Sequence, residues 1–226
     1  MMGTMLKTEL HTHTADDPHD AIPHTSQQLI DHAVALGYQA LAITLHGKQL
    51  DIEPLMPYAR ERGLVLIRGV EAFIRGRDVL LLNFTPEAER MRTFEDIGRL
   101  KAAYPNGLVI APHPFFPAPR CLWGYMNMHA DLFDAVELNA MRTRLVDFNG
   151  AAVRWATRHG KPVVGNSDVH FLAQLGTTYS VVDAEPTADH VCAAIRAGRV
   201  QVRSEPLSVA RAAQLGAMIV ASGWRK

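Results

Sequence analysis

Short apolar runs with strand character alternate with helical stretches along this 226-residue chain, and this alternation restricts the possible folds more than any other feature. Residues 26–36 have apolar side chains at helical spacing, end at Gly37 and lead into the apolar run 40–44. Strands that alternate with helices at this spacing favour a mostly parallel sheet. We therefore expect an α/β fold, a distorted barrel of βα units, with an open doubly wound sheet as the alternative.

The same pattern gives approximate bounds for each element. The predicted strands are residues 7–10, 40–44, 64–70, 79–84, 108–111, 135–138, 162–165 and 200–202, and the predicted helices are residues 26–36, 53–62, 93–103, 147–159, 187–197 and 206–221. No linker or repeat divides the sequence, so we expect a single domain over residues 1–226, with residues 206–226 as a C-terminal helix that packs on the barrel. The longest irregular stretch, residues 112–128, is rich in proline and aromatic residues, and long loops of this kind often cover functional sites.

Composition and charge point to no particular class of partner. Lys plus Arg and Asp plus Glu both number 23, so the net charge gives no general argument for binding to nucleic acid or to a membrane surface. No apolar run approaches the roughly 18 residues of a membrane span, and no signal-like segment precedes the first strand. The two cysteines, Cys121 and Cys192, match no zinc or redox spacing. We expect a cytoplasmic protein, whose oligomeric state the sequence does not indicate.

Residues able to bind metal follow most of the predicted strands. His11 and His13 are two apart in extended chain, which places both imidazoles on one face. The other such residues are His46, Glu71, His113, Glu137, Asp168 and His170. Each has an ordinary alternative role, for example a turn residue at His113 or a cap at Asp168. In a βα barrel, however, the carboxyl ends of all strands face one mouth, where these side chains would meet.

The chemistry of this set narrows the choice of metal. Imidazole and carboxylate without thiolate suit Zn, Mn or Fe rather than a structural cysteine-type zinc site. A carboxylate such as Glu71 can bridge two ions. We therefore expect a cluster of two or three divalent ions.

Five motifs in order give the chain a family resemblance. They are Glu9-Leu10-His11-Thr12-His13-Thr14, Thr44-Leu45-His46, Gly69-Val70-Glu71, Ala111-Pro112-His113-Pro114 and Gly165-Asn166-Ser167-Asp168-Val169-His170. With these motifs the chain resembles the PHP (polymerase and histidinol phosphatase) family of metal-dependent phosphoesterases, from residue 6 to about residue 203. The resemblance implies a distorted (β/α)7 TIM-like barrel.

The resemblance also implies how the ligands are shared. His11, His13, Glu71 and Asp168 would hold one ion, Glu71 and His113 a second, and His46 and His170 a third that His19 completes, with Asp17 as the competing candidate for that last position. Two positions depart from the family pattern. Leu45 stands where the family has Asp, and Leu80 stands where many members have a histidine ligand of the second ion.

The function implied is hydrolysis of a small phosphorylated substrate, a phosphomonoester or phosphodiester, by a metal-activated hydroxide. Asp168 and His170 would be the catalytic residues, and the proton for the leaving group would come from His170 or from a metal-site water. Arg120, Arg142 and Arg144 are candidate phosphate-binding residues, although each can equally be a surface arginine. The alternatives are a nuclease or nucleotide-processing enzyme and a non-catalytic metal-binding scaffold. Hydrolysis of a C–N bond by a related metal barrel is a further possibility, for which the sequence shows no bridging lysine.

Overall fold

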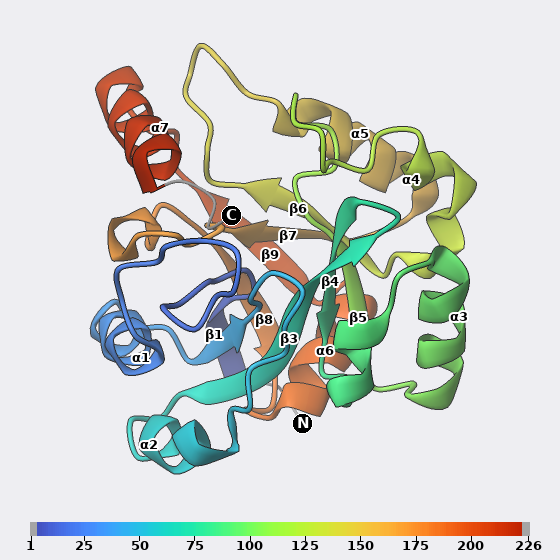
Figure 1. The fold of residues 1–226 in the computed structure, drawn as a ribbon, viewed down its shortest axis with the longest axis horizontal. Helices are drawn as coiled ribbons and strands as arrows, with labels where there is room; N and C mark the ends of the chain where they lie inside the picture. Colours follow the sequence, from blue (N-terminus) through green and yellow to red (C-terminus); the bar gives the residue numbers. More distant parts are fainter. Residues whose placement is uncertain (1–3, 223–226) are drawn as a thin grey trace.

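In the computed structural model, which describes residues 4–222, nine strands form one mixed sheet that curls into a nearly closed barrel (Figure 1). The strand order is β7-β6-β5-β4-β3-β2-β1-β8-β9. The two ends of the sheet meet where β7 lies against the hairpin of β8 and β9. At this closure the amide of Gly165 donates to Ser180 Oγ at 2.9 Å. The expected α/β fold, a distorted TIM-like barrel, is thereby confirmed.

The elements follow in chain order. The strands are β1 (Thr4–Glu9), β2 (Ala40–Ile43), β3 (Val65–Ile74), β4 (Arg77–Leu82), β5 (Leu108–Ala111), β6 (Ala135–Asn139), β7 (Val163–Asn166), β8 (Thr178–Ala184) and β9 (Val200–Ser204). The α-helices are α1 (Ser26–Ala35), α2 (Met56–Arg60), α3 (Phe94–Ala103), α4 (Tyr125–Met128), α5 (Asn149–His159), α6 (Ala188–Arg196) and α7 (Val209–Ser222). Short 3-10 turns are η1 (Glu53–Leu55), η2 (Pro86–Arg90), η3 (Ala130–Leu132) and η4 (Leu172–Gln174).

One strand junction departs from a repeated βα pattern. β3 runs to Ile74, three residues beyond Glu71, and turns directly into the antiparallel β4. The turn residues Arg75 and Gly76 have φ angles of 49° and 74°, which suit the tight turn of a two-residue hairpin. The sequence pattern places Glu71 just after the end of a strand. In the structure Glu71 instead lies within β3. Its neighbour across the hairpin is Leu80.

The sequence pattern also misses one strand. β8 pairs antiparallel with both β1 and β9 and so joins the last hairpin to the first strand. Its side chains alternate between buried and half-buried, from Thr178 to Ala184, as expected for a strand with one face inside the barrel. The predicted last helix begins later than expected, at Val209.

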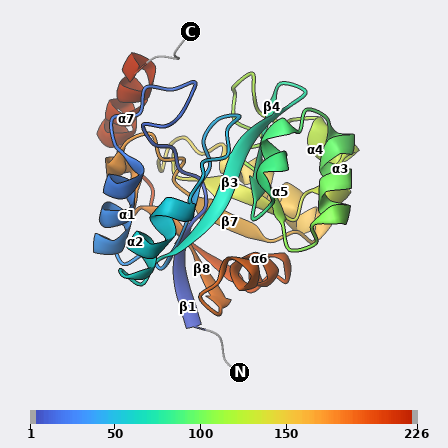
Figure 2. The same cartoon turned by 60° about the horizontal axis from the view of Figure 1, so that its bottom comes forward.

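Helices cover the barrel on three sides (Figure 2). α1 and α2 pack outside β2 and β3 in one apolar cluster, and α3 and α5 pack outside β4, β5 and β6 in another. α6 instead closes the amino-terminal end of the barrel, where Val191 and Ile195 join interior residues such as Leu80 and Ile110. The open end is therefore the one at the carboxyl ends of the parallel strands.

Between Thr4 and Ser222, no helix has both the length and the apolar character needed to cross a bilayer.

Candidate metal centre

The segment directly after β1 carries His11 and His13, whose side chains lie at the bottom of the open end of the barrel. His11 and His13 are fully buried, and their ring centroids lie 5.3 Å apart. Thr12 between them faces the other way and ties the segment to β2, since its hydroxyl donates to the Ala42 carbonyl at 2.6 Å. The amide of His13 donates to the Val169 carbonyl at 2.9 Å, which joins the first histidine segment to the last ligand loop.

Four side chains from three strands meet in one group at the bottom of the open end. The Nε2 atoms of His11 and His13 lie 3.3 and 3.4 Å from Glu71 Oε2. The same two nitrogen atoms lie 3.3 and 3.5 Å from Asp168 Oδ1. Four ligand atoms held about 2.1 Å from a tetrahedral ion are about 3.4 Å from one another, so this spacing fits a single divalent cation.

His113 extends this group on one side. Its Nε2 lies 3.5 Å from the second carboxylate oxygen of Glu71 and 3.9 Å from Asp168 Oδ2. His11, Glu71 and His113 form a set whose ligand atoms lie within 4.8 Å of one another. Leu80, buried opposite Glu71 in the hairpin, contributes only apolar surface on this face. The set of donors around His113 is accordingly smaller than that around His13.

On the other side lie His46 and His170, which form a second set with His13. His46 Nε2 is 3.1 Å from Glu71 Oε2, and its ring stacks on His13 with centroids 4.2 Å apart. Asp20 also faces this set, with Oδ2 3.0 Å from His170 Nε2. Asp20 does not follow a strand, and its position in the loop after β1 explains why the strand-end pattern misses it.

Carboxylates behind the histidines fix the orientation of the rings. Glu137 Oε2 lies 2.8 Å from His11 Nδ1, and Asp17 Oδ2 lies 3.1 Å from His13 Nδ1 and 3.0 Å from His46 Nδ1. A carboxylate bound to Nδ1 directs Nε2 of the same ring toward a metal and raises its basicity. The arrangement of Glu137 and Asp17 is thus the one found behind metal-binding histidines.

The charges within the cluster support one another. Burial alone would lower the pKa of His11, but the carboxylates of Asp168, Glu137 and Glu71 outweigh it and hold this pKa well above its usual range. Burial likewise opposes ionisation of Asp168, yet the surrounding histidines keep its pKa below the usual value. The pKa of His13 is lowered, by burial and by the neighbouring His46 and His170. The carboxylates are therefore ionised, and a cation can take the place of the protons that the imidazoles hold.

Three buried atoms in the cluster lack a hydrogen-bond partner: Nε2 of His11, Nε2 of His13 and Oε2 of Glu71. Buried polar atoms are nearly always paired, and leaving one unpaired is costly. In the four-residue group described above, Glu71 Oε2 lies 3.3 and 3.4 Å from the two nitrogen atoms. Nitrogen and oxygen donors arranged in this way fit a divalent metal ion, which would bind all three at once.

The backbone is strained at two of these positions. Among residues 4–222, only five other than glycine have a positive φ, and His113 and Asp168 are two of them, at 27° and 52°. Strain of this kind collects at functional sites where surrounding contacts impose it. Here Gln174 restrains the loop after β7, since its Nε2 donates to the Asp168 carbonyl at 2.9 Å and its Oε1 accepts from the amide of His170 at 2.9 Å.

The structure does not bring His19 into the cluster. Its half-buried ring packs against Phe73, with centroids 5.2 Å apart, outside the three sets of close ligand atoms. Asp17, the competing candidate, lies behind His13 and His46 and accepts hydrogen bonds from the amides of His19 and Asp20. These bonds hold the loop in the shape that directs Asp20 toward His170.

The three candidate arginines differ in position. Arg120 donates from Nε to Asp78 at 2.8 Å and lies over the Phe73 ring at 3.7 Å, close to His46 and His19. Arg142 donates to Asp147 and to Ser204. Arg144 is exposed in the loop before α5.

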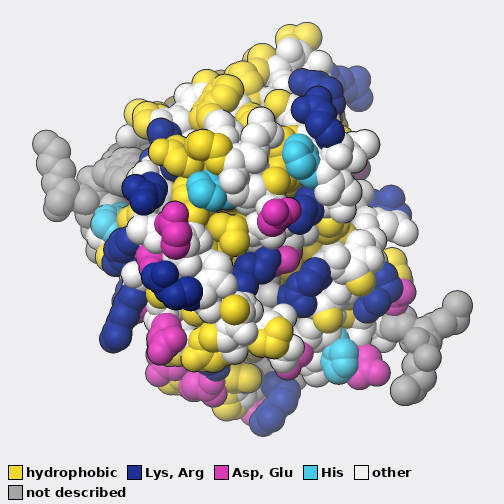
Figure 3. Space-filling model, turned by 90° about the vertical axis from the view of Figure 1, so that its right-hand side faces the viewer, with side chains coloured by type: hydrophobic (Ala, Val, Ile, Leu, Met, Phe, Trp, Pro, Cys, Tyr) yellow, Lys and Arg dark blue, Asp and Glu magenta, His cyan; other side chains and the backbone are white. Residues whose placement is uncertain are grey.

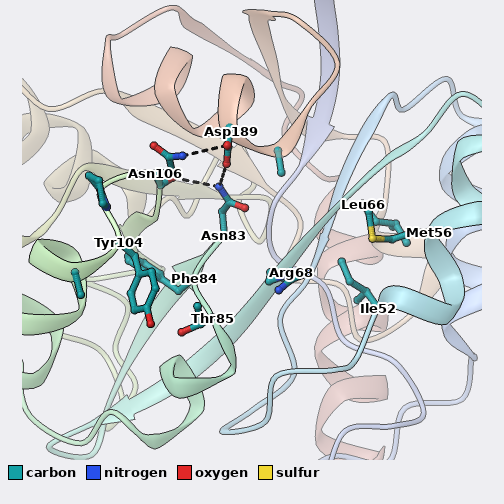
Figure 4. A pocket seen from close by; sticks show the side chains of 13 residues that line it. Ile52, Met56, Leu66, Arg68, Asn83, Phe84, Thr85, Tyr104, Asn106 and Asp189 are labelled. Carbon is teal, nitrogen blue, oxygen red and sulfur yellow. Dashed lines mark hydrogen bonds between the residues drawn. The ribbon is translucent and has the colours of Figure 1, made fainter.

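Cavities lie at both ends of the barrel. One of about 400 Å³ lies beside the metal centre, with His113 and Asp168 in its wall. Another of about 400 Å³ lies near the amino ends of β3 and β5 (Figure 4). There Asp189 accepts hydrogen bonds from Asn83 and Asn106, so these polar groups satisfy one another. The cavity beside the metal centre is the one connected with the chemistry of the cluster.

Comparison with known proteins agrees with this architecture. Residues 147–200 match a family model described as PHP-associated. No curated protein is significantly similar to the chain in sequence. A two-domain protein from Bacteroides vulgatus that contains a predicted PHP-like metal-dependent phosphoesterase is similar in structure, with a TM-score of 0.69 and 16% identity over 90% of this chain. The match spans 66% of that longer protein.

Two other solved structures are similar. PsfC from Pseudomonas syringae has a TM-score of 0.64 and 17% identity, over 96% of this chain and 97% of its own. A lesion-specific endonuclease from Pyrococcus furiosus has a TM-score of 0.61 and 16% identity, over 94% of this chain and 66% of its own. At such low identities the similarity concerns the fold. The resemblance to the PHP family is therefore confirmed: the chain has the fold of PHP-like metal-dependent phosphoesterases, and residues 147–200 match a PHP-associated model.

Proposed function

We propose that this chain is a metal-dependent phosphoesterase acting on a phosphomonoester or phosphodiester of a small molecule. The observation that carries this proposal is the convergence of His11 Nε2, His13 Nε2 and Glu71 Oε2, all buried and lacking hydrogen-bond partners, beside Asp168. A divalent cation bound at this point would satisfy all three of these buried atoms at once. The PHP-type fold, with its open end at the cluster, is consistent with this function.

In this proposal the residues divide among two or three divalent ions, of Mn, Zn or Fe. His11, His13, Glu71 and Asp168 would hold one ion, Glu71 and His113 a second, and His46 and His170 a third, with Asp20 beside them. When bound, such ions would supply an activated water nucleophile near neutral pH and would offset the charge of the phosphoryl oxygens.

The protein's own groups then position the substrate and manage protons. His170 is held between Asp20 and the Asp168 carbonyl, at 3.0 and 3.1 Å. In this proposal it gives a proton to the leaving group when only two ions are bound, and a metal-site water gives that proton when His170 is a ligand of the third ion. Arg120, fixed by Asp78 next to the cluster, is the best placed of the three arginines to bind a phosphate oxygen. Arg142 and Arg144 have the weaker claim, because Arg142 contacts Asp147 and Ser204 and not a residue next to the cluster, and Arg144 is exposed.

A second candidate function is cleavage of nucleic acid. The structural similarity to the endonuclease from Pyrococcus furiosus covers 94% of the chain and favours it. The neutral charge of the chain disfavours tight binding to a duplex. On the face viewed from the side of α3 and α4, Lys and Arg side chains are interspersed with Asp and Glu rather than gathered in one patch (Figure 3). A small substrate is therefore the preferred proposal.

The deciding experiment is a panel of phosphomonoesters, phosphodiesters and oligonucleotides, assayed with protein that has been stripped of metal and reloaded with Mn, Zn or Fe. We expect more than one equivalent of bound metal and turnover of small esters. Asp168→Asn should lower this turnover about 100-fold or more, because it replaces a charged ligand of the first ion by a neutral amide. Asp131→Asn, an exposed change in η3, is the matched control and should have no effect.

Each contrary outcome has a distinct meaning. Turnover of oligonucleotides alone would favour the nuclease. Metal-loaded protein without any turnover would favour the non-catalytic scaffold. Protein that retains no metal after reloading would contradict the metal centre itself.

A further inference from the structure

The cavity beside the metal centre has a polar end and an apolar wall. His113, Asp168 and Asn139 form the polar end, which lies at the cluster. The remaining lining residues come from the loop after β5 and from the segment between β6 and α5: Phe116, Pro117, Ala118, Cys121, Met141 and Phe148. A molecule bound in this cavity would thus have one end at the metal ligands and the rest against apolar side chains.

The aromatic part of the wall is formed by Phe116 and Phe148. Their ring centroids lie 5.5 Å apart at an angle of 59°, and the Phe116 ring also meets His113 edge-on at 6.2 Å. Phe148 is 41% exposed, so its ring is only partly covered by the protein. An apolar group inserted here would bury part of this ring and gain from the removal of apolar surface from water.

The polar groups in the cavity wall already have partners within the protein. Asn139 donates from Nδ2 to Glu137 Oε1 at 2.9 Å and accepts from the amide of Met141 at 2.9 Å. Cys121 Sγ lies 3.5 Å from His113 Nδ1. None of the described residues that line the cavity is Lys or Arg. A sugar rich in hydroxyl groups, or a second phosphate, would therefore find no matching partner along this wall.

We propose that the cavity binds an apolar, preferably aromatic, alcohol portion of the phosphate ester, so that the substrate class is phosphate esters of apolar alcohols. This proposal rests on the proposed function, because it places the phosphoryl group at His113 and Asp168. The organic group then lies between Phe116, Met141 and Phe148, which determine specificity.

The test compares benzyl phosphate with ethyl phosphate, whose alcohols are of similar acidity and differ mainly in the ring. For the Mn-loaded protein, we expect kcat/KM to be about tenfold higher for the benzyl ester, as expected for partial burial of one aromatic ring. In Phe148→Ala the ratio of the two kcat/KM values should fall toward one. Leu145→Ala, 83% exposed in the same segment and outside the cavity lining, is the matched control and should keep the ratio.

Binding provides a readout independent of turnover. Calorimetry on the Mn-loaded protein should show tighter binding of benzylphosphonate than of ethylphosphonate, and Phe148→Ala should abolish the difference. Turnover of both esters with no preference and no effect of Phe148→Ala would overturn the specificity proposal and leave the phosphoesterase intact. Selective phosphonate binding without turnover would support the cavity and contradict the proposed function. Neither turnover nor binding would overturn both.

Discussion

At the scale of single residues, the centre depends on carboxylates that lie behind the predicted ligands. Asp17 accepts from Nδ1 of both His13 and His46 and from the amide of His46 at 2.9 Å. Glu137 has the same relation to His11. A neutral group in place of such a carboxylate leaves the ligand in position but orients it less firmly and makes it a weaker base.

Asp17→Asn should accordingly weaken metal binding about 10- to 100-fold, without removing a predicted ligand from the central group. Competition with a chromophoric chelator measures this affinity. Asp16→Asn is the matched control, since the neighbouring Asp16 is exposed and its carboxylate accepts only from Thr14 and Ser26 in the described contacts. Equal affinities in the two variants would contradict the role assigned to Asp17.

The strand-end pattern in the sequence identifies the ligand residues that follow strands and misses those that do not. His11 and His13 can be predicted to act together, because residues two apart in an extended chain have side chains on the same face. The structure places both side chains in the cluster. The position of Asp20 in the cluster cannot be predicted from the sequence pattern, because a loop held by Asp17 turns its side chain toward His170. The pattern also identifies Glu137, which belongs to a predicted strand. Its contact with His11 cannot be predicted in this way, because it forms only when the barrel brings β6 close to the segment after β1. The metal ligands and their roles stay predictions until metal binding is measured.

At the scale of elements, the closure between β7 and the β8–β9 hairpin positions the last ligands. Gly165 lies at this closure, and a Cβ atom there would stand 2.8 Å from Val202 Cγ1 and 2.9 Å from the Tyr179 carbonyl oxygen. Asp168 and His170 follow directly after β7. The absence of a side chain at Gly165 thus allows the strands to approach and sets the position of the ligand loop.

Gly165→Ala should lower the free energy of unfolding by about 1–3 kcal/mol, because backbone and core atoms must move to admit the methyl group. Denaturant unfolding measures the loss, and metal affinity should fall with it. Gly98→Ala in α3 is the control, since its Cβ would meet only Leu132 at 3.8 Å. There we expect a gain of up to about 1 kcal/mol from the higher helix propensity of alanine. A Gly165→Ala protein as stable as the parent would contradict the tight closure.

The elements themselves were predicted with uneven success for physical reasons. Helices with a clear apolar repeat and a glycine at their end, such as α1 and α5, lie where the pattern placed them. β8 was missed, although its alternating Thr178–Ala184 run is typical of a strand with one buried face. The end of β3 was misjudged because Phe73 and Ile74 continue into a hairpin, and only the turn pair Arg75-Gly76 signals it.

At the scale of the whole molecule, the cluster links metal binding, protonation and stability. Burial alone would lower the pKa of His46, but the carboxylates of Glu71 and Asp17 outweigh it and raise this pKa to about 10, from an ordinary value of 6.5. Without metal, the folded state therefore binds this proton more tightly than the unfolded state does. The resulting stabilisation is complete below pH 6.5 and is lost as the pH rises toward 10.

We therefore expect the Tm of chelator-treated protein to fall as the pH rises from 6.5 toward 10. The stabilisation that bound metal adds to the protein should increase with pH. The reason is that metal competes with protons for the same imidazoles and binds more tightly at higher pH. Thermal unfolding with and without Mn should show a gap in Tm that widens with pH. A gap that is constant or narrows would contradict this linkage.

Two variants assign the effect to the cluster. His46→Gln should reduce the pH dependence of the chelator-treated protein, since it removes one of the raised pKa values. His190→Gln should leave it unchanged, because the side chain of His190 is 57% exposed in α6. Equal responses of the two variants would place the pH dependence outside the metal centre.

The closure of the amino-terminal end of the barrel by α6 has a consequence for the passage of molecules. With Val191 and Ile195 packed into that end, whatever reaches His11 and His13 arrives by the opposite opening and leaves by it. Under the proposed function, the alcohol and the inorganic phosphate released by hydrolysis share this single route with the incoming ester. Phosphate that lingers at the cluster would then obstruct the next ester, and the order in which the two products depart would govern the pace of the cycle.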